Sequence, residues 1–328
     1  MSESMAADEE LLAEDAEEGG SEEGVAVDEA DRRCGFIALV GAPNVGKSTL
    51  LNALVGTKLS IVSPKVQTTR ARVLGIIIEG TSQLVFVDTP GIFAPRRRLD
   101  RAMVAAAWQG ANDADLVVVL VDAARRHPMD ADTRGILTRM TQSGQPAVLV
   151  LNKVDLIRRD RLFALAEKLN HELPFVATFM ISALTGDGVA DLRLDLSRRV
   201  ELGPWLFPED QLSDIPLRLL ASEITREQVF IQLQQELPYA STVETEEWQE
   251  FDDGSVRIGQ VIFVERDSQK AIVLGRGGSR IKQIGIDARK ELEKVMDRRV
   301  HLGLFVKVRD NWGDDPDRYQ AIGLEFQR

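Results

Sequence analysis

Residues 41–48 read Gly-Ala-Pro-Asn-Val-Gly-Lys-Ser and follow a short apolar run at residues 36–40. They fit the pattern GxxxxGK[ST], in which glycines let backbone N–H groups turn inward around phosphate oxygens. Residues 47–54 are predicted to continue as a helix, which supplies the strand, loop and helix that such a loop requires. The segment therefore predicts an α/β fold with a nucleoside triphosphate site at the end of a strand.

Four further segments fall in an order and spacing that narrow this prediction: Thr68-Thr69, Asp88-Thr-Pro-Gly91, Asn152-Lys-Val-Asp155 and Ser182-Ala-Leu184. Asp88 ends an apolar run and lies 41 residues after Lys47, a position suited to holding Mg²⁺. A carboxylate at Asp155 can accept hydrogen bonds from N1 and the exocyclic amine of guanine, a donor pair that adenine lacks. Together the segments predict a guanine-nucleotide switch.

Each predicted GTP-site residue has a chemical reason. Lys47 is expected to reach the β- and γ-phosphates, and Ser48, Thr69 and Asp88 to hold Mg²⁺. Thr69 is preferred to Thr68 as the threonine that closes on the metal when the γ-phosphate is present, but either residue is still a candidate for this role. Asn152 is expected to bond the base, and a backbone N–H at Ser182-Ala183 to approach the guanine carbonyl. The full predicted set is Gly41, Ala42, Pro43, Asn44, Val45, Gly46, Lys47, Ser48, Thr49, Asp88, Thr89, Pro90, Gly91, Asn152, Lys153, Asp155, Ser182, Ala183 and Leu184.

Two positions bear on the rate of hydrolysis, for which Lys47, Asn44 and Thr69 are the predicted catalytic residues. Ile92 follows Gly91, where many switch GTPases carry a glutamine that orients the attacking water. Isoleucine cannot orient water, so slow turnover is expected unless another group does so. Asn44 is the candidate, because an asparagine there helps some related GTPases to hold K⁺ beside the phosphates.

Apolar segments along the chain predict the rest of the first domain. Buried strands are expected at residues 73–78, 83–87, 116–121, 147–151 and 175–181, with helices including 102–111 and 161–169 between them. Strands that alternate with helices are typical of a mostly parallel sheet. Two prolines and a glycine within residues 202–210 predict an interdomain linker.

The remaining residues predict a smaller α+β domain. A helix is expected at 215–236 with Pro216 in its first turn, strands at 241–251 and 256–266 around the turn at 252–254, an apolar strand at 269–274, a helix at 279–300 and a strand at 301–309. A GxxG loop with basic residues follows residue 274: Gly275, Arg276, Gly277, Gly278, Arg280 and Lys282. Residues 266–309 hold 12 Lys or Arg against 5 Asp or Glu. This is the KH arrangement, which clamps single-stranded nucleic acid.

Net charge and cysteine content add further bounds. The chain has a net charge of −12, but residues 1–31 hold 13 acidic residues and no basic ones, leaving 39 acidic against 40 basic residues in the body. The acidic segment is expected to be disordered, as a solubilising extension or a decoy that competes with RNA. The single Cys34 excludes an intrachain disulfide and, with no predicted secretory signal or membrane span, favours a cytoplasmic location. Trp312 is expected either to stack on a base or to anchor the C-terminal segment.

A switch GTPase domain followed by a linker and a KH domain resembles the Era family of bacterial ribosome-assembly GTPases, over about residues 33–328. The resemblance implies a GTPase domain at 33–203, a linker at 204–214 and a type II KH domain at 215–328. The acidic tail at 1–32 departs from the shorter start of the family, and its role stays open. The resemblance also implies binding of GTP or GDP with Mg²⁺, of single-stranded 16S rRNA near its 3′ end, and of the 30S precursor, released on hydrolysis. Peripheral attachment to the inner membrane and a monomeric state are further implications.

Three other functions stay open. In the first, the C-terminal domain of a GTPase binds a protein or a membrane, which predicts no salt-sensitive affinity for RNA. The second is a tRNA-modifying GTPase, which uses a C-terminal cysteine that this chain lacks. The third is an RNA-binding module with a degenerate nucleotide site, and intact Lys47, Ser48 and Asp155 argue against it.

Overall fold

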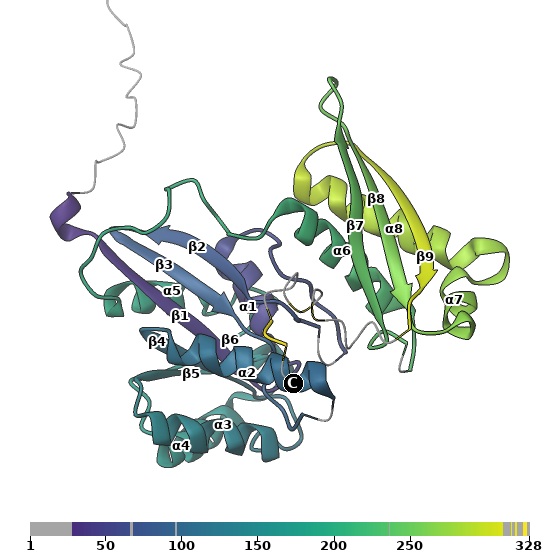
Figure 1. The fold of residues 1–328 in the computed structure, drawn as a ribbon. Helices are drawn as coiled ribbons and strands as arrows, with labels where there is room; N and C mark the ends of the chain where they lie inside the picture. The colour runs from purple at the N-terminus through teal and green to yellow at the C-terminus, as the bar shows by residue number, and fades with distance from the viewer. Residues whose placement is uncertain are drawn as a thin grey trace, which may run out of the picture.

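The computed structural model describes residues 28–65, 68–95, 97–235, 237–310, 316, 319 and 324–326, which form two α/β units joined by an extended segment (Figure 1). Residues 1–27, Trp312 and the acidic positions 314, 315 and 317 lie outside the described residues. The predictions made for the acidic tail and for Trp312 therefore stay predictions. Among the described helices, none is long and apolar enough to cross a membrane.

A six-stranded sheet in the order β2-β3-β1-β4-β5-β6 forms the first unit. One edge strand, β2 (Val73–Glu79), is antiparallel to its neighbour. The other strands are parallel: β1 (Arg33–Gly41), β3 (Ser82–Asp88), β4 (Leu116–Asp122), β5 (Ala147–Asn152) and β6 (Ala177–Ile181). The predicted strands and the mostly parallel sheet are confirmed, and the parallel strands bring the loops of the predicted site to one edge.

Alternate side chains of β1 enter two separate cores. Ile37 and Leu39 pack in the layer that contains α1 (Lys47–Val55) and α5 (Val189–Arg199). Ala38 and Val40 pack in the opposite layer with α2 (Arg98–Asn112), α3 (Ala131–Ser143) and α4 (Arg159–Glu172). Because both faces of the sheet are covered, the central strands are apolar throughout. The predicted helices at 102–111 and 161–169 are confirmed as parts of α2 and α4.

The second unit contains a three-stranded sheet in the order β7-β8-β9. Strands β7 (Ser241–Glu250) and β8 (Val256–Val264) form the predicted hairpin, and β9 (Val300–Val308) pairs parallel with β8. Helices α6 (Leu217–Gln232) and α8 (Ser279–Met296) cover the sheet, and α7 (Asp267–Leu274) leads into the GxxG loop. The predicted order of the outer helices and the three strands is confirmed.

One predicted strand and three predicted helix boundaries are wrong. Residues 269–274 belong to helix α7, because the Gln269 side chain accepts hydrogen bonds from the N–H groups of Glu265 and Arg266 and caps the first turn. Pro216 is extended, with φ −61° and ψ 138°, so α6 begins after it rather than including it. That helix ends at Gln232, and α8 ends at Met296 because Asp297 is left-handed.

The segment between the two units is fixed along the first sheet. The N–H groups of Leu206 and Phe207 donate to Gln83 Oε1, at 2.8 and 3.0 Å. Further along, Ile76 N–H donates to Leu212 O at 2.8 Å, so the segment also pairs with the edge strand β2. The predicted linker is therefore hydrogen-bonded to the first unit over much of its length.

Candidate functional site

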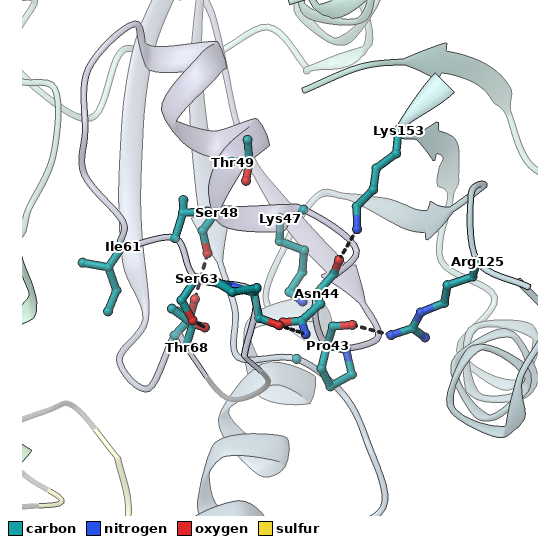
Figure 2. Close-up of a pocket in the computed structure, with 15 residues that line it drawn as sticks. Pro43, Asn44, Lys47, Ser48, Thr49, Ile61, Ser63, Thr68, Arg125 and Lys153 are labelled. Atoms are coloured by element: carbon teal, nitrogen blue, oxygen red, sulfur yellow. Dashed lines mark hydrogen bonds between the residues drawn. The ribbon is translucent and has the colours of Figure 1, made fainter. Parts of the chain in front are cut away.

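The loop between β1 and α1 has the backbone shape of a phosphate cradle. Gly46 has φ 101°, and a Cβ there would lie 2.3 Å from Asn152 Nδ2. A Cβ on Gly41 would lie 2.7 Å from Leu120 O. Only glycine fits these two positions, which explains the two glycines of the sequence pattern. The loop borders a cavity of about 490 Å³, which Figure 2 shows with its lining side chains.

Lys47 is buried at the base of this cavity. Its Nζ donates to Gly41 O and Ala42 O, both at 3.2 Å, so the ammonium is held inside the loop by carbonyls rather than by a carboxylate. Burial, opposed by Asp88 and reinforced by Arg125, lowers the pKa of Lys47 to about 8. An anionic ligand in the cradle would supply the negative charge that the ammonium lacks.

The predicted Mg²⁺ ligands lie together. Ser48 Oγ donates to Asp88 Oδ2 at 2.7 Å and lies 2.8 Å from Thr69 Oγ1. Ser60 Oγ also donates to Asp88 Oδ2, at 2.9 Å, and burial raises the pKa of the Asp88 carboxyl. The other oxygen, Oδ1, is buried and has no hydrogen-bond partner among the residues that the structure describes. Two hydroxyls and an unsatisfied carboxylate oxygen fit a small hard cation such as Mg²⁺.

The structure brings Thr69, and not Thr68, to this cluster. Thr68 Oγ1 donates to Lys65 O and lies 2.8 Å from Ser63 Oγ, away from Ser48. Elsewhere in the described residues, no group of three or more His, Cys, Asp or Glu side chains could hold a metal ion. The choice of Thr69 as the metal ligand stays a prediction, now with a geometric argument for it.

The residues after Asp88 close the cavity on another side. Gly91 approaches the phosphate loop so closely that a Cβ would lie 2.9 Å from Pro43 Cα. Ile92 N–H donates to Gly41 O at 3.1 Å, and the Ile92 side chain is buried in the core under α2. The isoleucine therefore faces away from the cavity, as expected for a residue that does not handle water.

Asn152 ties three loops together. Its Nδ2 donates to Val45 O at 2.8 Å, and its Oδ1 accepts from the N–H groups of Lys153 at 2.8 Å and Ala183 at 2.9 Å. The side chain is buried and engaged inside the protein, so the predicted contact with the base stays a prediction. Asp155 and Leu184, in contrast, are exposed.

Two basic side chains clamp the outside of the phosphate loop (Figure 2). Lys153 Nζ donates to Asn44 O at 2.8 Å and pairs with Asp122 at 2.7 Å. Arg125 donates to Pro43 O at 2.7 Å and pairs with Asp130 at 2.6 Å. Arg125 was not predicted, because an arginine in the loop after a strand carries no motif.

The GxxG loop joins α7 to α8. Gly275, Gly277 and Gly278 have φ of 71°, 58° and 76°, which other residues rarely adopt. Arg280 donates to Ile272 O at 3.0 Å and so braces the loop, whereas Arg276 and Lys282 are exposed. The loop and the first turn of α8 thus present backbone and the exposed side chains of Arg276 and Lys282 to solvent.

A groove of about 590 Å³ runs between α8 and β9. Lys282 was among the predicted residues on its rim, but Arg257, Arg289 and His301 were not. These come from three different elements, so only the fold brings them together. The floor is apolar and is formed by Ile281, Ile286, Leu302 and Leu304. A basic rim over an apolar floor suits a strand of nucleotides, with phosphates outside and bases inside.

Comparison with known proteins identifies the family. Residues 36–153 match the family described as 50S ribosome-binding GTPase, and residues 236–313 match the KH domain. The chain is 61% identical over 296 residues to the GTPase Era of Afipia carboxidovorans, an alignment that covers 90% of this chain and 96% of the relative. The chain belongs to the GTPase Era family. It is also 58% identical over 308 residues to the GTPase Era of Brucella suis biovar 1, covering 94% of this chain and 98% of that one.

Solved Era structures share the whole architecture. The crystal structure of Era in complex with MgGDPNP and nucleotides 1506–1542 of 16S ribosomal RNA matches with a TM-score of 0.83 at 37% identity, covering 89% of this chain and 99% of that chain. An Aquifex aeolicus Era variant bound to GDP·AlF4⁻ matches with the same TM-score, identity and coverage. The resemblance inferred from the sequence is confirmed: the protein is a GTPase with a P-loop domain followed by a KH domain.

Proposed function

We propose that this protein binds GTP with Mg²⁺, hydrolyses it to GDP and phosphate, and binds 16S rRNA near its 3′ end while the 30S subunit assembles. The observation that carries the proposal is the cluster of Ser48, Thr69 and Asp88, in which one oxygen of the buried carboxylate has no partner within the described part of the chain. The same chain carries a GxxG loop beside a basic-rimmed groove. One Era relative has been crystallised with MgGDPNP and the 16S segment 1506–1542.

Hydrolysis requires an in-line attack by water on the γ-phosphorus. A bond forms from the water oxygen to phosphorus, the bond to the β–γ bridging oxygen breaks, and its electron pair stays with GDP, while the water gives up a proton to a phosphate oxygen or to solvent. The ammonium of Lys47 and the N–H groups of the phosphate loop would bind the phosphate oxygens as charge shifts onto them. Ser48, Thr69 and Asp88 would hold Mg²⁺, which supplies positive charge at the phosphates. Asp155 would select guanine.

Potassium remains part of the proposal through Asn44. Asn44 has φ 62°, and its Nδ2 donates to Pro64 O at 2.8 Å, so a side-chain amide and a backbone carbonyl meet beside the cavity. Oxygens of this kind suit a weakly hydrated monovalent cation near the phosphates. Turnover should be faster in potassium than in sodium buffer, and equal rates in the two buffers would remove Asn44 from the catalytic residues.

RNA binding is assigned to the GxxG loop and the adjoining groove. Arg276 and Lys282 would meet phosphates at the loop, and Arg289 would extend the basic rim along the groove. Bases would lie on the apolar floor between α8 and β9. We place the protein in the cytoplasm as a monomer with the domain division predicted from the sequence. Peripheral membrane attachment stays a prediction of the family resemblance.

Lys47→Ala tests the nucleotide site directly. Loss of the buried ammonium should abolish GTP and GDP binding, measured with a fluorescent nucleotide. Lys168→Ala, which removes an exposed lysine of α4, is the matched control and should bind normally. Unchanged GTP affinity in Lys47→Ala would overturn the site assignment.

A further inference from the structure

Residues 58–65 and 68–70, here called the switch segment, run from the nucleotide cavity to the KH domain. Near the start of the segment, Lys58 Nζ pairs with Glu227 at 2.6 Å and with Glu291 at 3.0 Å. Val62 N–H donates to the other oxygen of Glu227 at 2.7 Å, and Lys65 donates to the carbonyls of the last turn of α6. Helix α6 therefore lies against the segment that carries the predicted metal ligand.

Arg226 of α6 holds the residue before Thr69. Its Nη2 donates to Thr68 O, and its Nε donates to Glu223 at 2.7 Å, which fixes the guanidinium. The side chain is 1% exposed, so this charge is buried between the two domains. Its Nη1 has no hydrogen-bond partner within the described residues. The guanidinium of Arg226 is therefore held at the domain contact by Glu223 and by the carbonyl of Thr68.

Arg70, the residue after Thr69, is anchored in the KH domain. Its guanidinium enters the KH domain and donates to Ser241 O at 3.0 Å and to the carbonyls of Pro238 and Tyr239, both at 3.4 Å. It also lies 5.6 Å from the centre of the Phe230 ring, while Arg226 lies 5.0 Å from the same ring. Burial, together with the charge of Arg226, lowers the pKa of Arg70 to about 9. Two arginines from different domains thus share one aromatic ring.

Thr69 lies between these two anchors. Its neighbours on both sides are bound to the KH domain, while its own hydroxyl reaches 2.8 Å from Ser48 Oγ. A switch threonine on a free loop would lose conformational entropy each time it closed on the metal. Here the KH domain restricts the backbone on both sides of Thr69, so less conformational entropy is lost when the threonine closes on the metal.

We propose that Arg226 of the KH domain is a positioning residue for GTP hydrolysis, which holds Thr69 at the metal side of the nucleotide cavity through the carbonyl of Thr68. The inference rests on the proposed role of Thr69. Arg226 does not touch the nucleotide site itself and acts only through the switch segment. Loss of the contact between Arg226 and the Thr68 carbonyl should lower the affinity for GTP and leave the affinity for GDP unchanged, because the threonine closes only when the γ-phosphate is present.

The test uses the full chain with Arg226→Gln, its conservative partner Arg226→Lys, and the control Arg218→Gln, which changes an exposed arginine of the same helix. In Arg226→Gln, kcat should fall about tenfold. Release of a non-hydrolysable GTP analogue should become about fivefold faster or more, and its binding should need more Mg²⁺. Release of GDP should not change. Arg226→Lys should recover part of the loss, and Arg218→Gln should match the wild type.

Each alternative result is decisive. Equal acceleration of GDP and GTP-analogue release would mean a general structural role and would overturn the inference, as would wild-type behaviour of Arg226→Gln. If that variant does not fold, Lys58→Met decides, because Lys58 is partly exposed and joins the switch segment to the same helix. It should show the same GTP-selective defect in weaker form, and a wild-type Lys58→Met would then contradict the inference.

Thr69→Ala separates this inference from the proposed site. If Thr69→Ala keeps normal hydrolysis and GTP-analogue affinity, the assignment of Thr69 fails and the inference fails with it. If Thr69→Ala is defective while Arg226→Gln is normal, the site stands and only the positioning role is wrong.

Discussion

Asn152 Nδ2 donates to Val45 O at 2.8 Å, which joins the loop after β5 to the phosphate loop after β1. The same side chain accepts from Ala183 N–H at 2.9 Å, so the loop after β6 is joined as well. One buried amide thus fixes the relative positions of the phosphate-binding and base-binding loops. The loops of the nucleotide site are therefore joined to one another by hydrogen bonds within the protein.

Asn152→Ala should destabilise the protein and weaken the binding of both GDP and GTP. Each buried partner left unpaired costs about 1–3 kcal/mol, so the melting temperature should fall and the affinities for GDP and GTP should fall together. Thermal unfolding and fluorescent-nucleotide titration measure the two effects. Asn170→Ala, at an exposed asparagine of α4, is the control. A stable variant with normal affinities would show that the three loops do not need this amide.

Proton uptake should accompany nucleotide binding above pH 8. The pKa of Lys47 is lowered to about 8 in the free protein, so at pH 9 the side chain is mostly neutral and gains a proton when phosphate arrives. Calorimetric titration at pH 9 in buffers of different ionisation enthalpy should show this uptake, and titration at pH 6.5, well below that pKa, should not. No buffer dependence at pH 9 would mean that Lys47 is fully charged there.

The same group makes the free protein more stable with rising pH. Between about pH 8 and 10.5 the unfolded chain holds a proton on this lysine that the folded chain has lost. Because the unfolded state binds more protons, the contribution of Lys47 to the free energy of unfolding rises with pH across this window. Comparison with Lys47→Met by denaturant titration isolates that contribution, and a slope of the opposite sign would contradict the lowered pKa.

Ile92→Gln should not create a fast GTPase. The side chain at this position is buried in the core under α2, so glutamine would place an amide among apolar groups, at a cost of about 1–3 kcal/mol. Single-turnover hydrolysis should be unchanged or slower, and denaturant unfolding should show reduced stability. A large acceleration would mean that the residue can turn toward the cavity and orient water.

Arg289→Gln should weaken RNA binding through charge alone. The exposed arginine lies on the rim of the groove between α8 and β9. Removing one phosphate contact should lower the slope of log affinity against log salt by about 0.7 for a single strand. Arg134→Gln, an exposed position on α3, is the control and should keep the wild-type slope. An unchanged slope in Arg289→Gln would mean that the RNA does not bind along this groove.

The sequence predicts elements whose chemistry is local. The phosphate loop follows from two glycines and a lysine at fixed spacing, and β1 and β3–β5 follow from continuous apolar runs. The apolar run at 269–274 was misassigned because six residues do not distinguish a buried strand from a capped helix. The capping contact of Gln269 decides between them, and only the structure shows it.

Sequence patterns do not predict contacts between segments that are far apart in the chain. Arg226 and Thr68 are 158 residues apart, and their contact depends on how the KH domain docks on the switch segment. Tyr319 and Leu324 pack against Met103 of α2, and no motif marks this contact. The rim of the groove brings together Arg257, Arg289 and His301, which lie on β8, α8 and β9 and meet only when these elements pack together.

The nucleotide state is expected to control RNA binding by the KH domain, because the family resemblance implies that the RNA is released on GTP hydrolysis. The direct measurement is binding of a single-stranded oligonucleotide from the 3′ end of 16S rRNA, with GDP or a non-hydrolysable GTP analogue present. Gly277→Asp is the variant to compare, because no atom lies within 4 Å of the added Cβ and the negative charge enters the loop without a steric clash. The φ of 58° strains any residue other than glycine, and aspartate is one of the few that adopt this region. Tighter binding with the GTP analogue, lost in Gly277→Asp, is the predicted result. Absence of binding in both nucleotide states would contradict it and would assign the KH domain to a protein or membrane partner.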